Sequence, residues 1–318
     1  MPTWGQLLQE LKKVQEDTNQ PPFDAVRRRY LTELHSYTKR NTILYATKWT
    51  QPSGVGPEDV SINEEDVQGL MEVIFEMKTT DLDLVLHSPG GSAEATEAVV
   101  TYLRSKFDDI RVIIPHAAMS AATMLACAAN RIVMGKHSFL GPIDPQFILQ
   151  TPLGLQAVPA QAILDQFRRA QEECKDPKAL GSWLPILSQY GPALLVQCDN
   201  AIELSRQLVR AWLHKYMLTG KSAGSADKIA DELARHESYK SHRRHISLDD
   251  ARNLGLVIEP LEADHTFQDR VLSVFHATMH TFAGTFAVKI IENHLGRAYI
   301  KMQRQIVIPK QAEVPPSH

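Results

Sequence analysis

Ser120 is the residue of this chain whose setting points most directly to chemistry. It stands where a strand over 110–114 gives way to an apolar helix, and Gly90 lies in a Ser-Pro-Gly-Gly turn that follows the preceding strand. The first N–H groups of a helix lie beside such a hydroxyl, and a glycine-rich turn can bring further N–H groups to the same point. A hydroxyl nucleophile beside N–H donors is what acyl transfer requires, because the attack creates an oxyanion. Ser120 is also a natural helix N-cap, and the two roles are compatible.

The elements that must position these residues alternate between strands and helices. Apolar runs bounded by turn residues predict strands at 41–47, 82–87, 110–114 and 131–134, with helices after Ser61, over 92–107 and over 120–129. Strands followed by helices through short connections predict an α/β layer fold with a parallel sheet and right-handed crossovers. The candidate residues follow strand C-terminal ends, where such sheets bind ligands.

The character of the sequence changes after residue 146. Helices are predicted over 159–173, 194–217 and 264–292, and a short helix that ends at Gly255 is followed by a strand. The tail over 311–318 is of low complexity.

Three motifs carry a family resemblance. Ser88-Pro-Gly-Gly, Ala118-Met-Ser-Ala and Ala251-Arg-Asn-Leu-Gly-Leu together resemble the Clp protease and crotonase superfamily. Leu140-Gly-Pro-Ile-Asp-Pro-Gln more specifically resembles the serine dehydrogenase proteinase family, a Clp-fold branch related to signal peptide peptidase A. The resemblance implies a Clp/crotonase-like repeated β-β-α core with added N- and C-terminal helices. It divides the chain into an N-terminal helical extension (1–40), a catalytic domain (41–260) and a C-terminal helical extension and tail (261–318).

The same resemblance implies a catalytic site. Ser120 would be the nucleophile, and the N–H groups of Gly91 and Ala121 would form the oxyanion hole. Pro142 stands near the position of the Clp histidine, so the base must come from further along the chain. The serine dehydrogenase proteinase order of Ser, Asp and His is supplied by Asp144 and by His245 or His242. We prefer His245, because it directly precedes the apolar segment that begins at Ile246.

The sequence leaves other bases open. Signal peptide peptidases resemble Ser/Lys dyad enzymes, and Lys175 or Lys178 falls roughly where such a lysine would lie. Either would need burial to lower its pKa, yet both flank Asp-Pro in a polar stretch. His116 and His137 are also near Ser120 in sequence.

The resulting hypothesis is a serine endopeptidase that acts on peptide or protein substrates without a cofactor. Clp relatives assemble into rings, so a homo-oligomer is expected, with the helix over 264–292 as a natural contact. A crotonase-type acyl-CoA enzyme is the alternative, since the same fold directs N–H donors at a thioester oxygen. A non-catalytic oligomeric scaffold is a third interpretation, which the uncertain base keeps open.

Composition narrows the remaining classes. A net charge of -3 and a pI near 6.5 argue against nucleic-acid binding. The three cysteines are widely spaced, and no signal peptide or apolar tract of roughly 20 residues is present, so we expect a cytoplasmic protein without a membrane span. His276 and His280 are spaced as zinc ligands on a helix but lack the glutamate of a zinc protease, so no metal is expected.

Overall fold

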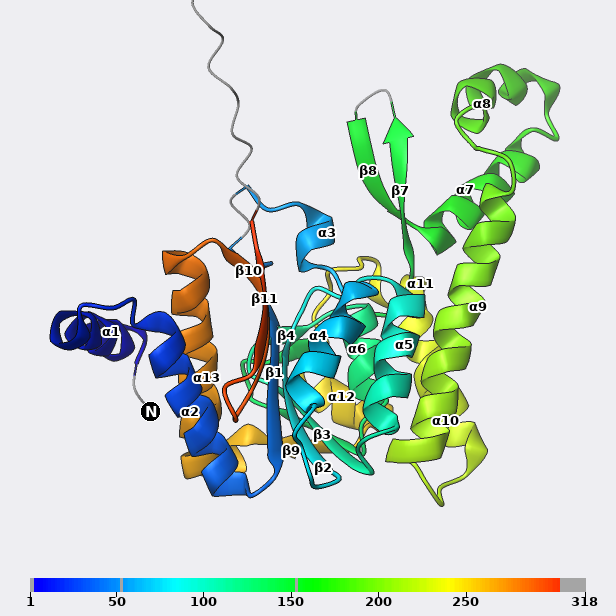
Figure 1. The fold of residues 1–318 in the computed structure, drawn as a ribbon. Coiled ribbons are helices and arrows are strands. Elements are labelled where there is room, and N and C mark those ends of the chain that lie inside the picture. The colour runs from blue at the N-terminus through cyan, green and yellow to red at the C-terminus, as the bar shows by residue number, and fades with distance from the viewer. Residues whose placement is uncertain (1–2, 52–53, 152–153, 304–318) are drawn as a thin grey trace, which may run out of the picture.

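The computed structural model describes residues 3–51, 54–151 and 154–303, and it is built around one central sheet (Figure 1). From one edge to the other, its seven strands are β11 (Ala298–Met302), β10 (Ala287–Asn293), β1 (Asn41–Thr47), β2 (Asp81–His87), β3 (Asp109–Ile114), β5 (Arg131–Met134) and β9 (Ile258–Pro260). The five neighbouring strands from β1 to β9 are parallel, while β10 runs antiparallel to β1 and β11 antiparallel to β10.

Helices cover both faces of this sheet (Figure 1). One face carries α1 (Trp4–Thr18), α2 (Phe23–Thr38) and α13 (His265–Gly284). The other carries α4 (Glu65–Ile74), α5 (Ala93–Arg104), α6 (Ala121–Cys127), α9 (Leu194–Trp212), α10 (Ala223–Ala234) and α12 (Leu248–Leu254). The α/β fold predicted from the alternation of strands and helices is confirmed.

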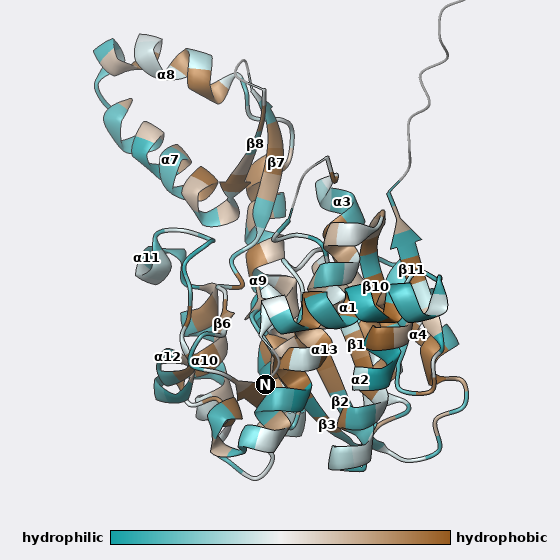
Figure 2. Cartoon of the chain, turned by 90° about the vertical axis from the view of Figure 1, so that its left-hand side faces the viewer, coloured by the Kyte–Doolittle hydropathy of each residue, from teal (hydrophilic) through white to brown (hydrophobic). Residues whose placement is uncertain are grey.

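The inner strands of the sheet are buried on both sides, and this explains the nearly continuous apolar sequences of β1, β2 and β5. Successive side chains of a strand point to opposite faces, so Ile43 and Tyr45 enter one core while Leu44 and Ala46 enter the other. Figure 2 shows the hydrophobic strands enclosed by helices whose outer surfaces are hydrophilic.

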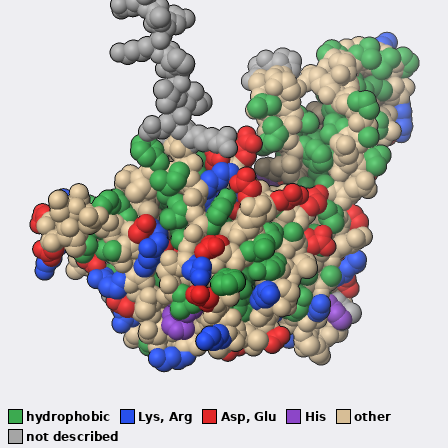
Figure 3. Space-filling view, viewed as in Figure 1, with side chains coloured by type: hydrophobic (Ala, Val, Ile, Leu, Met, Phe, Trp, Pro, Cys, Tyr) green, Lys and Arg blue, Asp and Glu red, His purple; other side chains and the backbone are tan. Residues whose placement is uncertain are grey.

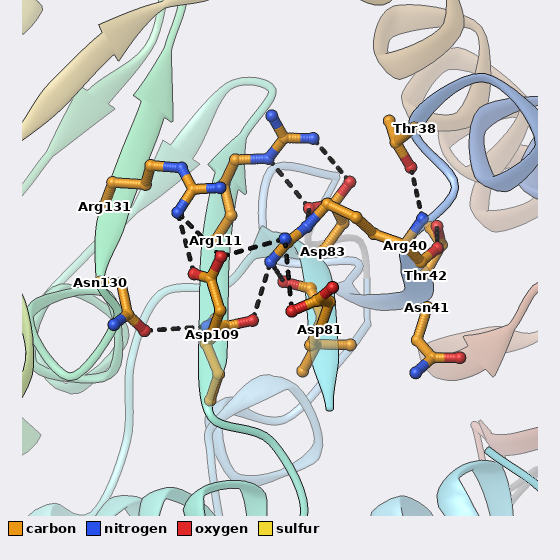
Figure 4. A network of polar contacts seen from close by, with 12 residues as sticks. Thr38, Arg40, Asn41, Thr42, Asp81, Asp83, Asp109, Arg111, Asn130 and Arg131 are labelled. Carbon is orange, nitrogen blue, oxygen red and sulfur yellow. Dashed lines mark hydrogen bonds and ion pairs between the residues drawn. The ribbon is translucent and has the colours of Figure 1, made fainter. Parts of the chain in front are cut away.

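An ionic network joins the N-terminal ends of the parallel strands (Figure 4). Asp83 of β2 is fully buried and accepts hydrogen bonds from Arg40 and Arg111. Asp109 of β3 accepts from Arg40 and Arg131. These contacts tie β2, β3 and β5 to the segment that leads into β1 and leave the C-terminal ends of the strands free for a site.

The C-terminal part of the chain differs from the prediction. The helix expected over 264–292 ends at Gly284, and the following residues form β10 inside the central sheet. Gly284 packs so closely on the Phe23 ring that a Cβ there would lie 2.3 Å from it. The segment after 261 therefore completes the sheet as well as covering it, and the predicted low-complexity tail lies outside the described residues.

A hairpin and two helices project from the body of the molecule (Figure 1). This arm consists of β7 (Gln146–Thr151), β8 (Gly154–Pro159), α7 (Ala160–Glu173) and α8 (Leu180–Leu187), and α9 returns from it to the body. The strands β7 and β8 form the hairpin by antiparallel pairing, and they were not predicted from the sequence. Within the described ranges, no helix combines the length and apolar character needed to cross a bilayer.

Candidate active site

The turn after β2 lies directly against Ser120. Gly90 has φ +99°, and a Cβ on it would lie 2.8 Å from the Ser120 Cβ and 2.6 Å from the Met119 carbonyl oxygen. A side chain at Gly90 would therefore collide with the backbone that carries the candidate nucleophile. Hydrogen bonds between Ser88 and the Ala117–Met119 segment hold the two turns together, at 3.2 and 3.0 Å.

Ser120 has a strained backbone between the short strand β4 (Ala117–Ala118) and α6. Its φ of +51° and ψ of -121° are rare for a residue with a side chain, and such conformations cost on the order of 1–3 kcal/mol. Ser120 occupies the N-cap position of α6, but its side chain makes no capping hydrogen bond. The strain thus holds a hydroxyl that the helix does not use for its own termination.

Two N–H groups beside Ser120 are available to a ligand. Among the described residues, neither the Gly91 nor the Ala121 N–H has a hydrogen-bond acceptor. Ile62 pairs with Gly90 and Ser92 on either side of Gly91, so the Gly91 N–H points away from Ile62. These two groups are the donors that the family resemblance assigned to the oxyanion hole.

Thr123 connects the Ser120 turn to the turn that carries Asp144. The Thr123 hydroxyl lies 2.9 Å from the carbonyl oxygens of Ala118 and Gly141, and it accepts from the Gly141 N–H at 3.1 Å. The Ile143 N–H donates to the Leu233 carbonyl at 2.9 Å. Hydrogen bonds therefore hold the backbone at Gly141 and at Ile143, and together they fix the position of Asp144, the next residue.

Asp144 is buried between two histidines. Its side chain is only 2 % exposed, with Oδ1 2.8 Å from His242 Nδ1 and Oδ2 2.9 Å from His236 Nδ1. A carboxylate that accepts from Nδ1–H leaves Nε2 of the same ring as the proton acceptor. Asp144 therefore orients His242 in the tautomer that a general base needs.

His242 and Ser120 line one cleft, which has a volume of about 740 Å³. Gly90, Gly91 and two residues of β7, Gln146 and Ile148, line it as well. Figure 3 shows the surface hollowed between the body and the arm, with acidic side chains near the rim. The acidic residues that line the cleft are Glu58, Glu64 and Glu65.

His245, the base preferred from sequence, lies elsewhere. Its ring stacks on Phe139 with a centroid distance of 3.6 Å, and it lines a separate cleft with Tyr239 and Asp250. The structure thus brings Asp144 together with His242 and not with His245. His236, the second partner of Asp144, was missed, because no local pattern distinguishes it from a surface histidine.

The other candidate bases are exposed or make contacts elsewhere. Lys175 is 70 % exposed and ion-paired with Glu172, and Lys178 is exposed; both belong to the projecting arm. His137 Nε2 lies 3.0 Å from the Pro115 carbonyl oxygen, and burial lowers the pKa of His116. None of these side chains lines the cleft that contains Ser120.

His276 and His280 both lie against Trp4 of the N-terminal helix. The His280 ring stacks on Trp4 at 3.7 Å, and its Nε2 lies 3.0 Å from the Trp4 carbonyl oxygen. The described residues contain no group of three or more His, Cys, Asp or Glu side chains arranged to hold a metal ion.

Comparisons with known proteins identify the family of the chain. A strained serine beside two N–H groups, with a paired Asp and His across a cleft, is typical of the class of serine hydrolases. The family model of ClpP-like SDH-type serine proteinases matches residues 60–267. The match covers more than half of the chain, and the chain belongs to this family.

The curated relatives share part of their length with this chain. Two uncharacterized proteins of Methanocaldococcus jannaschii, MJ1495 and MJ0137, are 30% identical over 168 residues and 28% identical over 194 residues. These matches cover 50% and 56% of this chain, and 55% and 63% of the relatives. A solved structure, a serine-to-alanine mutant of the 1510-N membrane-bound stomatin-specific protease, is 13% identical with a TM-score of 0.39, and the match covers 66% of this chain and 79% of that one. That likeness is too distant to bear on function.

Proposed function

We propose that this protein is a serine peptidase in which Ser120 is the nucleophile, His242 the general base and Asp144 the residue that orients the base. The observation that carries the proposal is the Asp144–His242 pair on the same cleft as the strained Ser120. Family membership supports the reaction class. The base differs from the one preferred from sequence, since the histidines that pair with Asp144 are His242 and His236.

The proposed reaction begins with attack of Ser120 Oγ on the carbonyl carbon of a peptide bond in the cleft. His242 Nε2 takes the hydroxyl proton, and Asp144 stabilises the resulting imidazolium through its 2.8 Å contact with Nδ1. The N–H groups of Gly91 and Ala121 donate to the oxyanion. His242 then gives its proton to the leaving amine, and water, deprotonated by His242, releases the acyl group from Ser120.

The described structure contains no hydrogen bond between Ser120 and His242. Catalytic hydrogen bonds are often long or poorly aligned without substrate and tighten in the complex, so this geometry is compatible with the proposed roles. The Ser/Lys alternative gains no support, because Lys175 and Lys178 are exposed on the arm.

Labelling with a fluorophosphonate probe tests the proposal directly. The wild-type chain should be labelled at one site, and Ser120→Ala should abolish labelling. Ser92→Ala is the matched control, since Ser92 lines the same cleft but caps α5 through its hydroxyl. A folded wild-type chain that fails to react, or that still reacts after Ser120→Ala, would contradict the proposal. Endopeptidase action and homo-oligomerisation stay predictions, which cleavage-site mapping and light scattering would test.

A further inference from the structure

A buried charged network lies behind the wall of the cleft. Lys289 of β10 is 1% exposed and Asp66 of α4 is fully buried. Lys289 Nζ donates to Asp66 Oδ1 at 2.6 Å, and the Tyr45 hydroxyl donates to Asp66 Oδ2 at 2.7 Å. Burial lowers the pKa of Lys289, and the nearby Asp66 carboxylate opposes that effect. Neither charged group takes part in the reaction proposed above.

The network ends on the backbone of one short segment. Lys289 Nζ also donates to the Ser61 carbonyl at 2.8 Å, and the Asn63 N–H donates to Asp66 Oδ2 at 3.0 Å. The two contacts lie on either side of Ile62. Residues 61–63 line the cleft, so the buried charges fix the backbone of the cleft wall.

That segment in turn holds the turn that carries the candidate oxyanion donor. The Ile62 N–H donates to the Gly90 carbonyl at 2.7 Å, and the Ile62 carbonyl accepts from the Ser92 N–H at 3.1 Å. A Cβ on Gly91 would lie 2.2 Å from the Ile62 oxygen, so the two backbones are in direct contact. This pairing directs the Gly91 N–H to the side away from Ile62.

Stability alone does not account for the network. Replacing a buried ion pair by apolar groups of similar volume is often neutral or stabilising, so a core does not need such a pair. A charged pair does supply directional contacts to a backbone carbonyl and a backbone N–H, which apolar packing cannot.

We propose that Lys289, Asp66 and Tyr45 are positioning residues that hold residues 61–63, and through them the Gly91 N–H, in the place where an oxyanion forms. This inference rests on the proposed function of Ser120. It gives β10, from the C-terminal part of the chain, a role in the reaction without contact with substrate.

The test compares the rate of fluorophosphonate reaction in the full chain and in variants. Lys289→Met alone leaves Asp66 charged and buried, so the main variant is Lys289→Met with Asp66→Asn, which removes both charges. Loss of one oxyanion donor costs about 10²–10³-fold in rate, and we expect a displaced donor to lower the maximal inactivation rate by about 10-fold or more. The probe concentration for half-maximal rate should stay within about threefold, because ground-state binding does not use the oxyanion contact.

Two further variants keep the test decisive. Tyr45→Phe removes a single hydroxyl and retains the ion pair, so we expect a folded protein whose maximal inactivation rate falls by about two- to fivefold. Lys301→Met is the matched control, since Lys301 lies on the adjacent strand β11 and pairs with Glu65 and Asp59 without contacting the backbone of residues 61–63. Its rate should equal that of the wild type.

The outcomes separate this inference from the proposed function. A positioning role predicts that the maximal inactivation rate falls by the same factor at every pH. The midpoint of the pH profile should not shift, because the general base sets that midpoint. Wild-type rates in folded Tyr45→Phe and in the folded double variant overturn the inference and leave the proposed function intact. A loss confined to probe affinity overturns it as well. Failure of the wild-type chain to react with the probe would instead contradict the proposed function.

Discussion

Exchanging His242 and His245 for alanine, one at a time, distinguishes the base indicated by the structure from the base preferred from sequence. His242 donates to buried Asp144 and lines the cleft with Ser120, whereas His245 stacks on Phe139 beside another cleft. We expect His242→Ala to lower the rate of fluorophosphonate reaction by about 10²–10⁴-fold, the usual contribution of a general base. We expect His245→Ala to change it by less than about threefold.

The stability effects of the two variants also follow from their contacts. His242→Ala removes one of the two hydrogen bonds to the Asp144 carboxylate, which should lower the free energy of unfolding by about 1–3 kcal/mol. His245→Ala removes an aromatic stack and should cost about 0.5–1.5 kcal/mol. The two variants thus differ by a modest amount in stability and by orders of magnitude in expected rate.

The assay measures the second-order rate of probe reaction for each variant, after circular dichroism has shown that it is folded at the assay temperature. His236→Ala belongs in the same series, because it removes the other partner of Asp144 and retains His242. If His245→Ala lost the larger factor while folded His242→Ala reacted at the wild-type rate, the assignment of the base from the Asp144 contact would be refuted.

Three further predictions concern the turn beside Ser120 and the two ends of the central sheet. Gly90→Ala should lower the free energy of unfolding by about 1–3 kcal/mol and strongly reduce probe labelling, since φ is +99° and the new Cβ would lie 2.8 Å from the Ser120 Cβ. Thermal melts measure the first effect, and labelling of the folded fraction measures the second. Wild-type values for both would contradict the prediction. Burial, with a smaller contribution from His116, lowers the pKa of His87 to about 3. Below pH 6.5 the imidazole of His87 becomes protonated in the unfolded chain but stays neutral in the folded chain. The free energy of unfolding should therefore fall by on the order of 4 kcal/mol as the pH drops from 6.5 toward 3. A His87→Phe variant whose melting temperature depends on pH as strongly as that of the wild type would count against this prediction. Asp83→Asn should lower the free energy of unfolding by about 3–5 kcal/mol, because it removes the carboxylate charge that Arg40 and Arg111 share. The labelling rate of the folded variant should equal that of the wild type. Denaturant titration tests the first expectation, and slower labelling of the folded variant would contradict the second.

The strands that form the middle of the sheet could be predicted closely from the sequence. Both ends of β1 at Asn41 and Thr47, and both ends of β5 at Arg131 and Met134, agree with the prediction. Their sequences are apolar because helices cover both faces, and turn residues bound them, so local information is sufficient.

Elements whose partners are distant in sequence were predicted less well. β10 was assigned to a helix because its apolar residues continue the pattern of α13, yet it pairs antiparallel with β1, from the opposite end of the chain. The hairpin of β7 and β8 was also missed, since each strand has six residues and packs on the arm rather than on the main core. In both cases the partner decides the conformation, and tertiary pairing overrides local propensity.

The site shows the same division between local and distant information. The Ser120 turn and its glycines are local features, and the structure places them together. The choice between His242 and His245 depends on a pairing that no spacing rule reveals: Ile246 bonds to Leu140 on both its N–H and its carbonyl, at 2.9 and 3.0 Å. This bridge sets His245 beside Phe139, which precedes Leu140, and the chain before it returns to Asp144 with His242. His245 is held in place because the next residue, Ile246, is bonded to Leu140. His242, three residues earlier, can reach the Asp144 carboxylate. Proximity to the apolar run therefore places the exposed His245 ring on Phe139, and it argued against the use of His245 as the base.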